Sequence, residues 1–202
     1  MSLIVRQWEA PFSDTRVFLL HGLGADENDL ADLALGLNSF GSVTSLRAPV
    51  PYGPGFAWFD VQFGPDGVRS VDADGILAAG AMVAKYAASS AEPRKVMIGF
   101  SQGAAVALAA AAQHPDQFVA VAALSGFPPP NFEALLNTPN CPAILLQHGE
   151  EDRVVPPHFS QEMAQALRNG NKKVTHQKYP MGHTISAESF SELRRWLAET
   201  PA

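Results

Sequence analysis

The stretch Gly99-Phe100-Ser101-Gln102-Gly103 lies between an apolar run, Val96–Ile98, and an alanine-rich stretch from Ala104 to Ala112. This order predicts a strand, a sharp turn and a helix, with Ser101 at the turn. Both flanking positions call for glycine, because side chains there would collide with the neighbouring strand and helix. The helix would direct its free N–H groups and positive dipole end toward the serine. The segment therefore predicts a nucleophile elbow, the alternative being an ordinary Gly/Ser-rich turn in a parallel sheet.

Short apolar runs alternate with helical patterns along the whole chain, which is typical of an α/β fold with a mostly parallel central sheet and helices on both faces. We expect strands at Val17–His21, Val43–Arg47, Lys95–Phe100, Val119–Ser125, Ala143–His148 and Val174–Tyr179, with an additional edge strand at Leu3–Trp8. We expect helices at Glu27–Leu37, Asp74–Ser89, Gln102–Gln113, Pro157–Asn169 and Ala187–Glu199. Because only Gly126 to Cys141 separate two of these strands, the pattern leaves no room for a cap domain.

Composition limits the class of protein further. With 202 residues and 47% hydrophobic content, the chain is expected to form a single domain spanning 1–202. A net charge of −6 argues against a nucleic-acid partner. The single cysteine, Cys141, excludes an intrachain disulfide framework and fits a reducing compartment. No signal peptide and no membrane span are expected, so the predicted location is cytoplasmic. The oligomeric state is left open, with a homodimer as one possibility.

A serine nucleophile needs a base to accept its proton and an acid to orient that base. On this kind of sheet the three residues follow the order serine, acid, histidine, each after a strand. Of the six histidines, His183 lies in the loop directly after the last predicted strand, where the base is required. His148 ends a strand before the acidic cluster, and His176 falls inside a strand pattern. The order therefore selects His183.

Three acidic residues compete for the third position. Glu150, Glu151 and Asp152 follow the apolar strand that ends at His148, with Gly149 allowing a tight turn. The chain re-enters the protein at Val155 after this turn, so Asp152 is the residue expected to be buried against the histidine. The two glutamates are expected to face water.

Two backbone N–H groups must converge on the negative charge that develops on the substrate during acyl transfer. The residue after the serine, Gln102, is expected to supply one. The loop His21-Gly22-Leu23-Gly24 after the first long strand supplies the other, with Leu23 as the best position. His21 is expected to be a structural hydrogen-bonding residue, and Asp26 is expected to cap the helix that begins at Glu27.

Several short motifs resemble, in the same order, those of the phospholipase/carboxylesterase family of α/β-hydrolases, which includes acyl-protein thioesterases and small bacterial carboxylesterases. They are Leu20-His21-Gly22-Leu23-Gly24-Ala25-Asp26, Arg47-Ala48-Pro49, the elbow Gly99–Gly103, Leu124-Ser125-Gly126-Phe127, His148-Gly149-x-x-Asp152 with Val155-Pro156, and Gly182-His183-x-Ile185-Ser186. The resemblance spans nearly the whole chain.

The resemblance implies an α/β-hydrolase fold and hydrolysis of a small-molecule carboxylic ester or thioester without a metal or organic cofactor. It assigns the triad to Ser101, Asp152 and His183, with Leu23 and Gln102 as the oxyanion donors. The Pro/Tyr/Gly-rich segment Pro49–Gly55 is more similar to compact bacterial members than to eukaryotic depalmitoylating enzymes. Depalmitoylation of proteins is therefore not predicted.

The aromatic residues of the following loop are candidates for the substrate pocket. They are Tyr52, Phe56, Trp58 and Phe59. Aromatic side chains on such a loop either line an apolar pocket or anchor the loop to the core. The first alternative predicts short to medium acyl chains lying against this loop, and the second places the pocket elsewhere, beside Phe127 and the loop Pro128–Pro130. A lactone or C–C bond hydrolase and a non-catalytic hydrolase-like binding protein for a small ligand remain as alternative functions.

Overall fold

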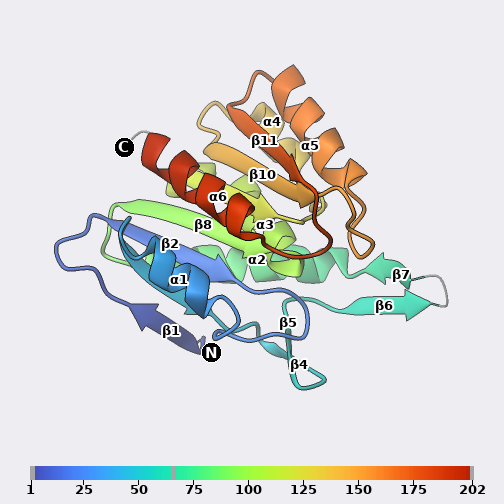
Figure 1. The fold of residues 1–202 in the computed structure, drawn as a ribbon, viewed down its shortest axis with the longest axis horizontal. Helices are drawn as coiled ribbons and strands as arrows, with labels where there is room; N and C mark the ends of the chain where they lie inside the picture. Colours follow the sequence, from blue (N-terminus) through green and yellow to red (C-terminus); the bar gives the residue numbers. More distant parts are fainter. Residues whose placement is uncertain (1–2, 65–66, 201–202) are drawn as a thin grey trace.

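The computed structural model describes residues 3–64 and 67–200. Its central sheet consists of seven strands: β1 (Val5–Trp8), β2 (Thr15–Leu20), β3 (Ser42–Leu46), β8 (Arg94–Phe100), β9 (Ala120–Leu124), β10 (Ala143–Gly149) and β11 (Val174–Tyr179). They lie in the order β1-β3-β2-β8-β9-β10-β11 (Figure 1). The edge strand β1 is antiparallel to β3, and the other neighbouring pairs are parallel. The predicted mostly parallel sheet is confirmed.

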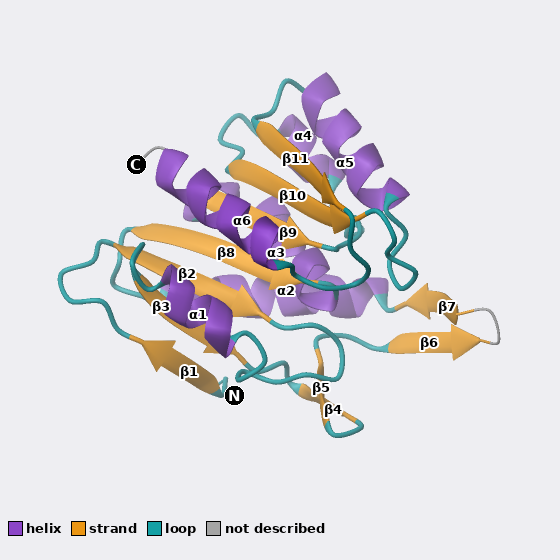
Figure 2. Ribbon diagram, viewed as in Figure 1, coloured by secondary structure: helices purple, strands orange, loops and turns teal. Residues whose placement is uncertain are grey.

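Helices cover both faces of this sheet (Figure 2). They are α1 (Ala31–Leu37), α2 (Ala73–Ala88), α3 (Gln102–Gln113), α4 (Glu133–Asn137), α5 (His158–Asn169) and α6 (Ala187–Glu199), with a short 3-10 helix at Pro115–Gln117. Alternate residues of each strand face opposite helical layers. In β2, Phe18 and Leu20 belong to the core under α2 and α3, whereas Val17 and Leu19 belong to the core under α1 and α6.

The helix α3 begins directly after the predicted elbow and packs against both α2 and the sheet. Its residues from Gln102 to Ala112 are buried, and most of them are alanines. Because short side chains allow close packing, α3 sits tightly against the strands that precede and follow it. This packing fixes the N-terminal end of α3 at the carboxyl edge of the sheet, where the candidate site lies.

The beginning of α1 differs from the prediction. The helix begins at Ala31 and not at Glu27, and its N-cap position is Leu30, without a side-chain cap. Asp26 instead accepts a hydrogen bond from the backbone N–H of Asn28 at 2.8 Å. The Glu27 carboxylate is bound by the Arg47 guanidinium, with both N–O distances at most 2.6 Å. A local turn at Asp26 and a long-range ion pair at Glu27 therefore hold this segment out of the helix. Asp and Asn side chains commonly offer the backbone such a turn.

Two small hairpins between β3 and α2 were not predicted. They are β4 (Val50–Tyr52) with β5 (Gly55–Ala57), and β6 (Val61–Gly64) with β7 (Gly67–Val71). The second hairpin projects from the body of the molecule (Figure 1). Only α4 and its flanking loops lie between β9 and β10, so the expected absence of a cap domain is confirmed. Within the described parts of the chain, no helix is long and apolar enough to cross a membrane.

Candidate active site

Ser101 occupies a strained turn between β8 and α3. Its backbone dihedrals are φ 55° and ψ −116°, a region that a residue with a side chain rarely adopts. The two glycines of the motif are required by close backbone contacts. A Cβ atom on Gly99 would lie 2.1 Å from the carbonyl oxygen of Gly103, and one on Gly103 would lie 2.2 Å from that of Leu20. The turn therefore presents the serine hydroxyl at the carboxyl edge of the sheet.

His183 lies in the loop between β11 and α6, with its imidazole beside Ser101. Its Nε2 atom is 2.9 Å from the Ser101 hydroxyl oxygen, and its Nδ1 atom is 2.7 Å from Oδ2 of Asp152. The ring of Phe100 stacks obliquely on the imidazole, with the ring centroids 4.8 Å apart. These contacts fix both the position and the plane of the ring. If Nδ1 carries a proton for the carboxylate, Nε2 is free to accept the serine proton.

Asp152 lies in the turn after β10 and is only 5% exposed. Its Oδ1 atom accepts hydrogen bonds from the backbone N–H groups of Val154 and Val155, both at 2.9 Å. Glu150 and Glu151 are exposed, as expected, but their backbone N–H groups are used: they donate to the carbonyl oxygens of Tyr179 and Met181. These two hydrogen bonds hold the turn that contains Asp152 against the loop that contains His183.

A second histidine lies close to the Asp152 carboxylate. His148 is fully buried, and its Nε2 atom lies 2.9 Å from the carbonyl oxygen of Val155 and 3.4 Å from Oδ2 of Asp152. Since a carbonyl can only accept, Nε2 carries the proton and donates. Burial lowers the pKa of His148, so the ring is neutral. No role was assigned to His148 from the sequence, because this residue precedes the acid. Its spacing of four residues from Asp152 is the feature of the sequence that could have indicated the contact.

The two expected oxyanion donors lie beside the serine. Gln102 is the first residue of α3, where a backbone N–H has no acceptor within the helix. The loop that contains Leu23 passes close to the elbow, since a Cβ atom on Gly22 would lie 3.5 Å from the Cβ of Ser101. Leu23, Gln102 and Ser101 line one cavity.

The side chain of Gln102 has a role that the sequence did not indicate. Its Oε1 atom accepts a hydrogen bond from the backbone N–H of Trp58 at 2.7 Å, and its Nε2 donates to the carbonyl oxygen of Phe59 at 2.9 Å. The amide thus pairs with the backbone of the aromatic loop as a strand would. These two bonds tie the start of α3 to that loop.

A cavity of about 660 Å³ contains Ser101 and His183. Its wall is mostly apolar and comes from the elbow, the base of the β6–β7 hairpin, the turn after Asp152 and the start of α5. The remaining described lining residues are Gly22, Leu23, Phe59, Val61, Ser70, Val71, Phe100, Gln102, Phe127, Arg153, Val154, Val155, Pro156 and Phe159. Phe127 contacts Phe59 edge-to-face, with ring centroids 6.3 Å apart.

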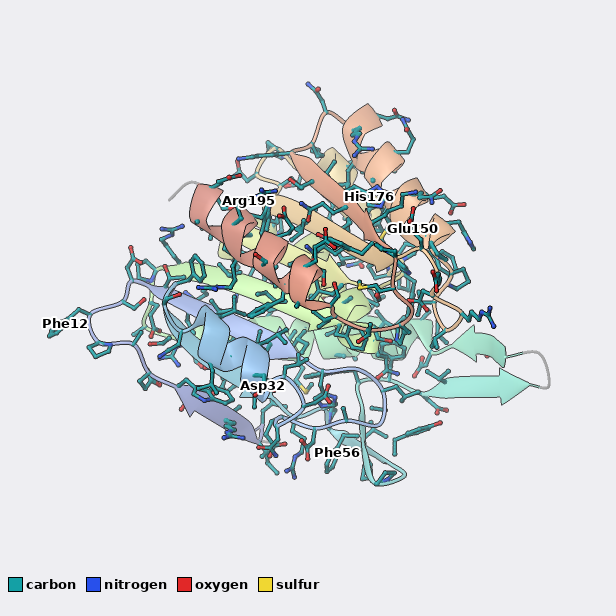
Figure 3. The ribbon with its side chains drawn as sticks, in the orientation of Figure 1. Phe12, Asp32, Phe56, Glu150, His176 and Arg195 are labelled. Atoms are coloured by element: carbon teal, nitrogen blue, oxygen red, sulfur yellow. The ribbon has the colours of Figure 1, made fainter. Side chains whose placement is uncertain are left out.

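Of the four aromatic residues predicted to bind substrate, Phe59 lines this cavity, and Tyr52, Phe56 and Trp58 are not among its described lining residues. Trp58 is 2% exposed, and its indole N–H donates to the carbonyl oxygen of His21 at 2.9 Å. The ring of Phe56 lies under the Arg47 guanidinium, 4.6 Å from its carbon, and Figure 3 shows it far from the turn that carries Glu150. Tyr52 lies on the exposed hairpin β4. The contacts of Trp58 and Phe56 are those of rings that anchor the loop, the second alternative given for these residues, whereas Tyr52 is exposed.

Two further histidines have structural contacts. The buried ring of His21 donates from Nδ1 to the carbonyl oxygen of Gly22 at 2.7 Å and accepts at Nε2 from the backbone N–H of Ala48 at 3.1 Å. Burial lowers its pKa. His176 contacts the hydroxyl of Ser160 at 3.1 Å. Across residues 3–64 and 67–200, no group of three His, Cys, Asp or Glu side chains is placed to hold a metal ion.

The sheet order, the elbow after β8 and the acid and histidine after β10 and β11 define an α/β-hydrolase. Residues 9–200 match the phospholipase/carboxylesterase family, and the chain belongs to this family of hydrolases. It is 28% identical to acyl-protein thioesterase 1 of Mycosarcoma maydis, over 90% of this chain and 89% of the relative. It is 27% identical to carboxylesterase SOBER1 of Arabidopsis thaliana, over 91% and 89%. The crystal structure of esterase PE8 covers the whole of both chains with a TM-score of 0.86 and 25% identity.

Proposed function

We propose that the protein hydrolyses carboxylic esters, and thioesters, of short to medium acyl chains through an acyl-enzyme on Ser101. The observation that carries the proposal is the hydrogen-bonded chain Ser101–His183–Asp152, with distances of 2.9 Å and 2.7 Å. In this mechanism the serine oxygen attacks the carbonyl carbon while Nε2 of His183 takes its proton. Asp152 orients the ring and stabilises the imidazolium that forms.

The tetrahedral intermediate places a negative charge on the former carbonyl oxygen. We propose that the backbone N–H groups of Leu23 and Gln102 bind it, which is supported by their positions beside Ser101. The intermediate collapses as Nε2–H of His183 protonates the leaving alcohol or thiol. Water then attacks the acyl-enzyme, with His183 again acting first as base and then as acid, and the carboxylic acid leaves.

The acyl chain is proposed to lie along the apolar wall formed by Phe59, Phe127 and Phe159. This wall is continuous with Ser101 in one cavity of about 660 Å³, and no cap domain covers it. Each methylene buried there contributes about 0.8 kcal/mol. Relatives named as a carboxylesterase and as an acyl-protein thioesterase support both ester and thioester cleavage. A cytoplasmic location and a homodimer stay predictions.

The test is turnover of a p-nitrophenyl ester series from acetyl to dodecanoyl, with an acyl-CoA as the thioester. We expect Ser101→Ala and His183→Ala to lower kcat by about four to six orders of magnitude while the thermal midpoint stays close to that of the native protein. A fluorophosphonate should label the native protein at one site and leave Ser101→Ala unlabelled. Undiminished labelling of Ser101→Ala, or ester turnover by His183→Ala at the native rate, would falsify the mechanism.

A further inference from the structure

Arg153 places a positive charge at the rim of the cavity. Among the described residues that line it, Arg153 is the only arginine or lysine, and no aspartate or glutamate is present. The Arg153 side chain is exposed, so its guanidinium can reach a ligand without first losing a buried contact. A guanidinium stays protonated at any physiological pH.

The position of Arg153 is coupled to that of the proposed catalytic acid. Asp152 precedes it, and the Asp152 carboxylate binds the backbone N–H groups of Val154 and Val155, both at 2.9 Å. Val155 is itself buried and accepts a hydrogen bond from His148 at its carbonyl oxygen. The same contacts that hold the acid therefore hold the backbone of Arg153 at the rim.

No carboxylate neutralises this guanidinium within residues 3–64 and 67–200. Of the two glutamates in the same turn, Glu150 forms an ion pair with Lys178, with an N–O distance of 3.3 Å, and neither contacts Arg153. The whole chain has a net charge of −6, so a cation at this rim is not part of a generally basic surface. The donors of Arg153 are left available to an anion.

We propose that Arg153 selects substrates that carry an anionic group, a carboxylate or a phosphate, separated from the scissile carbonyl by a short apolar spacer. This inference rests on the proposed esterase function. The planar fork of a guanidinium matches a carboxylate or phosphate with two parallel hydrogen bonds. The apolar side chains of Val154 and Phe159 line the cavity beside it and suit the spacer. The anion can belong to the acyl chain or to the leaving group.

Two matched pairs of esters distinguish these two sources. The first pair is mono-p-nitrophenyl adipate and p-nitrophenyl hexanoate, which differ by a carboxylate at the far end of the acyl chain. The second pair is the acetyl ester of p-hydroxybenzoate and the acetyl ester of methyl p-hydroxybenzoate, which differ by a carboxylate on the leaving group. The readout is the ratio of kcat/KM for the anionic ester to that for its neutral partner, after subtraction of spontaneous hydrolysis.

The variants are Arg153→Gln and Arg153→Glu, with Arg195→Gln as the matched control. Arg195 lies on α6 (Figure 3), where it pairs with Glu192, and its loss changes the net charge by the same amount. We expect Arg153→Gln to lower the ratio by about three- to tenfold in one of the two pairs, Arg153→Glu to lower it further, and Arg195→Gln to leave it unchanged. Added salt should reduce the native preference.

Ratios that stay the same in both Arg153 variants, for both pairs, overturn the inference and leave the esterase function intact. An equal fall in Arg195→Gln also overturns it, because net charge and not the position of Arg153 would then be responsible. A native protein that turns over none of the four esters contradicts the proposed function, and the selectivity with it.

Discussion

Three hydrogen bonds hold the Asp152 carboxylate in place, and a second imidazole lies close to it. The backbone N–H groups of Val154 and Val155 bind Oδ1, whereas the imidazoles of His183 and His148 lie at Oδ2, at 2.7 Å and 3.4 Å. A buried carboxylate is tolerated when its oxygens are supplied with hydrogen bonds in this way. We infer that His148 is a positioning residue, since it touches the acid and the turn after it but does not line the cavity.

Replacement of His148 tests this role. His148→Leu removes the donor to the carbonyl oxygen of Val155 and the imidazole beside Asp152, and we expect kcat to fall about tenfold with little change in KM. In His148→Gln, a side-chain N–H can occupy nearly the place of Nε2, so most of the activity should return. Steady-state kinetics on p-nitrophenyl butyrate measure both. Equal losses in the two variants would indicate that the ring acts only through packing.

At the scale of elements, the aromatic segment Phe56–Phe59 connects the two loops that carry the proposed oxyanion donors. The backbone of Phe56 exchanges hydrogen bonds with Gly24 and Ala25 at 2.8 Å and 2.9 Å. Trp58 adds the bond from its indole N–H to His21, and Gln102 binds the segment from the elbow side. Phe56 and Trp58 therefore support the site from outside the cavity, whereas Phe59 and Phe127 form part of the cavity wall.

This division predicts different chain-length profiles for two aromatic substitutions. Trp58→Phe removes a buried hydrogen bond, so we expect kcat to fall by a similar factor for acetyl, butyryl and octanoyl esters, with a lower thermal midpoint. Phe127→Ala removes part of the acyl wall, so kcat/KM for octanoyl esters should fall about three- to tenfold more than for acetyl esters. The p-nitrophenyl series measures both profiles. A profile flattened by Trp58→Phe and unaffected by Phe127→Ala would place the acyl chain elsewhere.

At the scale of the whole molecule, burial keeps several histidines neutral. Burial lowers the pKa of three histidines: His21 in the core, His148 beside Asp152, and His176 against α5. In the unfolded chain these groups titrate near their ordinary pKa of about 6.5. Below that pH the unfolded state binds more protons than the folded state. The free energy of unfolding therefore rises with pH through this range and levels off above the unfolded-state pKa.

We therefore expect the free energy of unfolding to decrease as the pH falls below about 6.5, by up to about 1.4 kcal/mol per pH unit for each histidine that stays neutral in the fold. A second loss is expected at lower pH, because ion pairing with Arg16 lowers the pKa of Glu92 from 4.5 to about 2. Urea unfolding across this pH range measures both. Glu92→Gln should remove only the loss at lower pH. A free energy of unfolding that is constant between neutral pH and about pH 5 would contradict the loss expected from the histidines.

Much of the architecture could be predicted from the sequence because its signals are local. Strand and helix periodicity lie within single segments, and the predicted bounds of α3, β11 and α6 agree with the structure. The short hairpins escaped prediction because their strands are only a few residues long and contain proline and glycine. The beginning of α1 was misplaced because the ion pair between Glu27 and Arg47 joins residues distant in sequence.

The order of Ser101, Asp152 and His183 after three strands is readable from the amino-acid sequence alone, and parallel strands bring their carboxyl ends to one edge. The surroundings of these three residues depend on how distant segments pack together. The cavity wall combines Val71, Phe127 and Arg153 from separate elements, and the imidazole of His148 reaches Asp152 only because the turn folds back over it. Local patterns encode which face of an element is buried, but they do not encode which distant side chain it will meet.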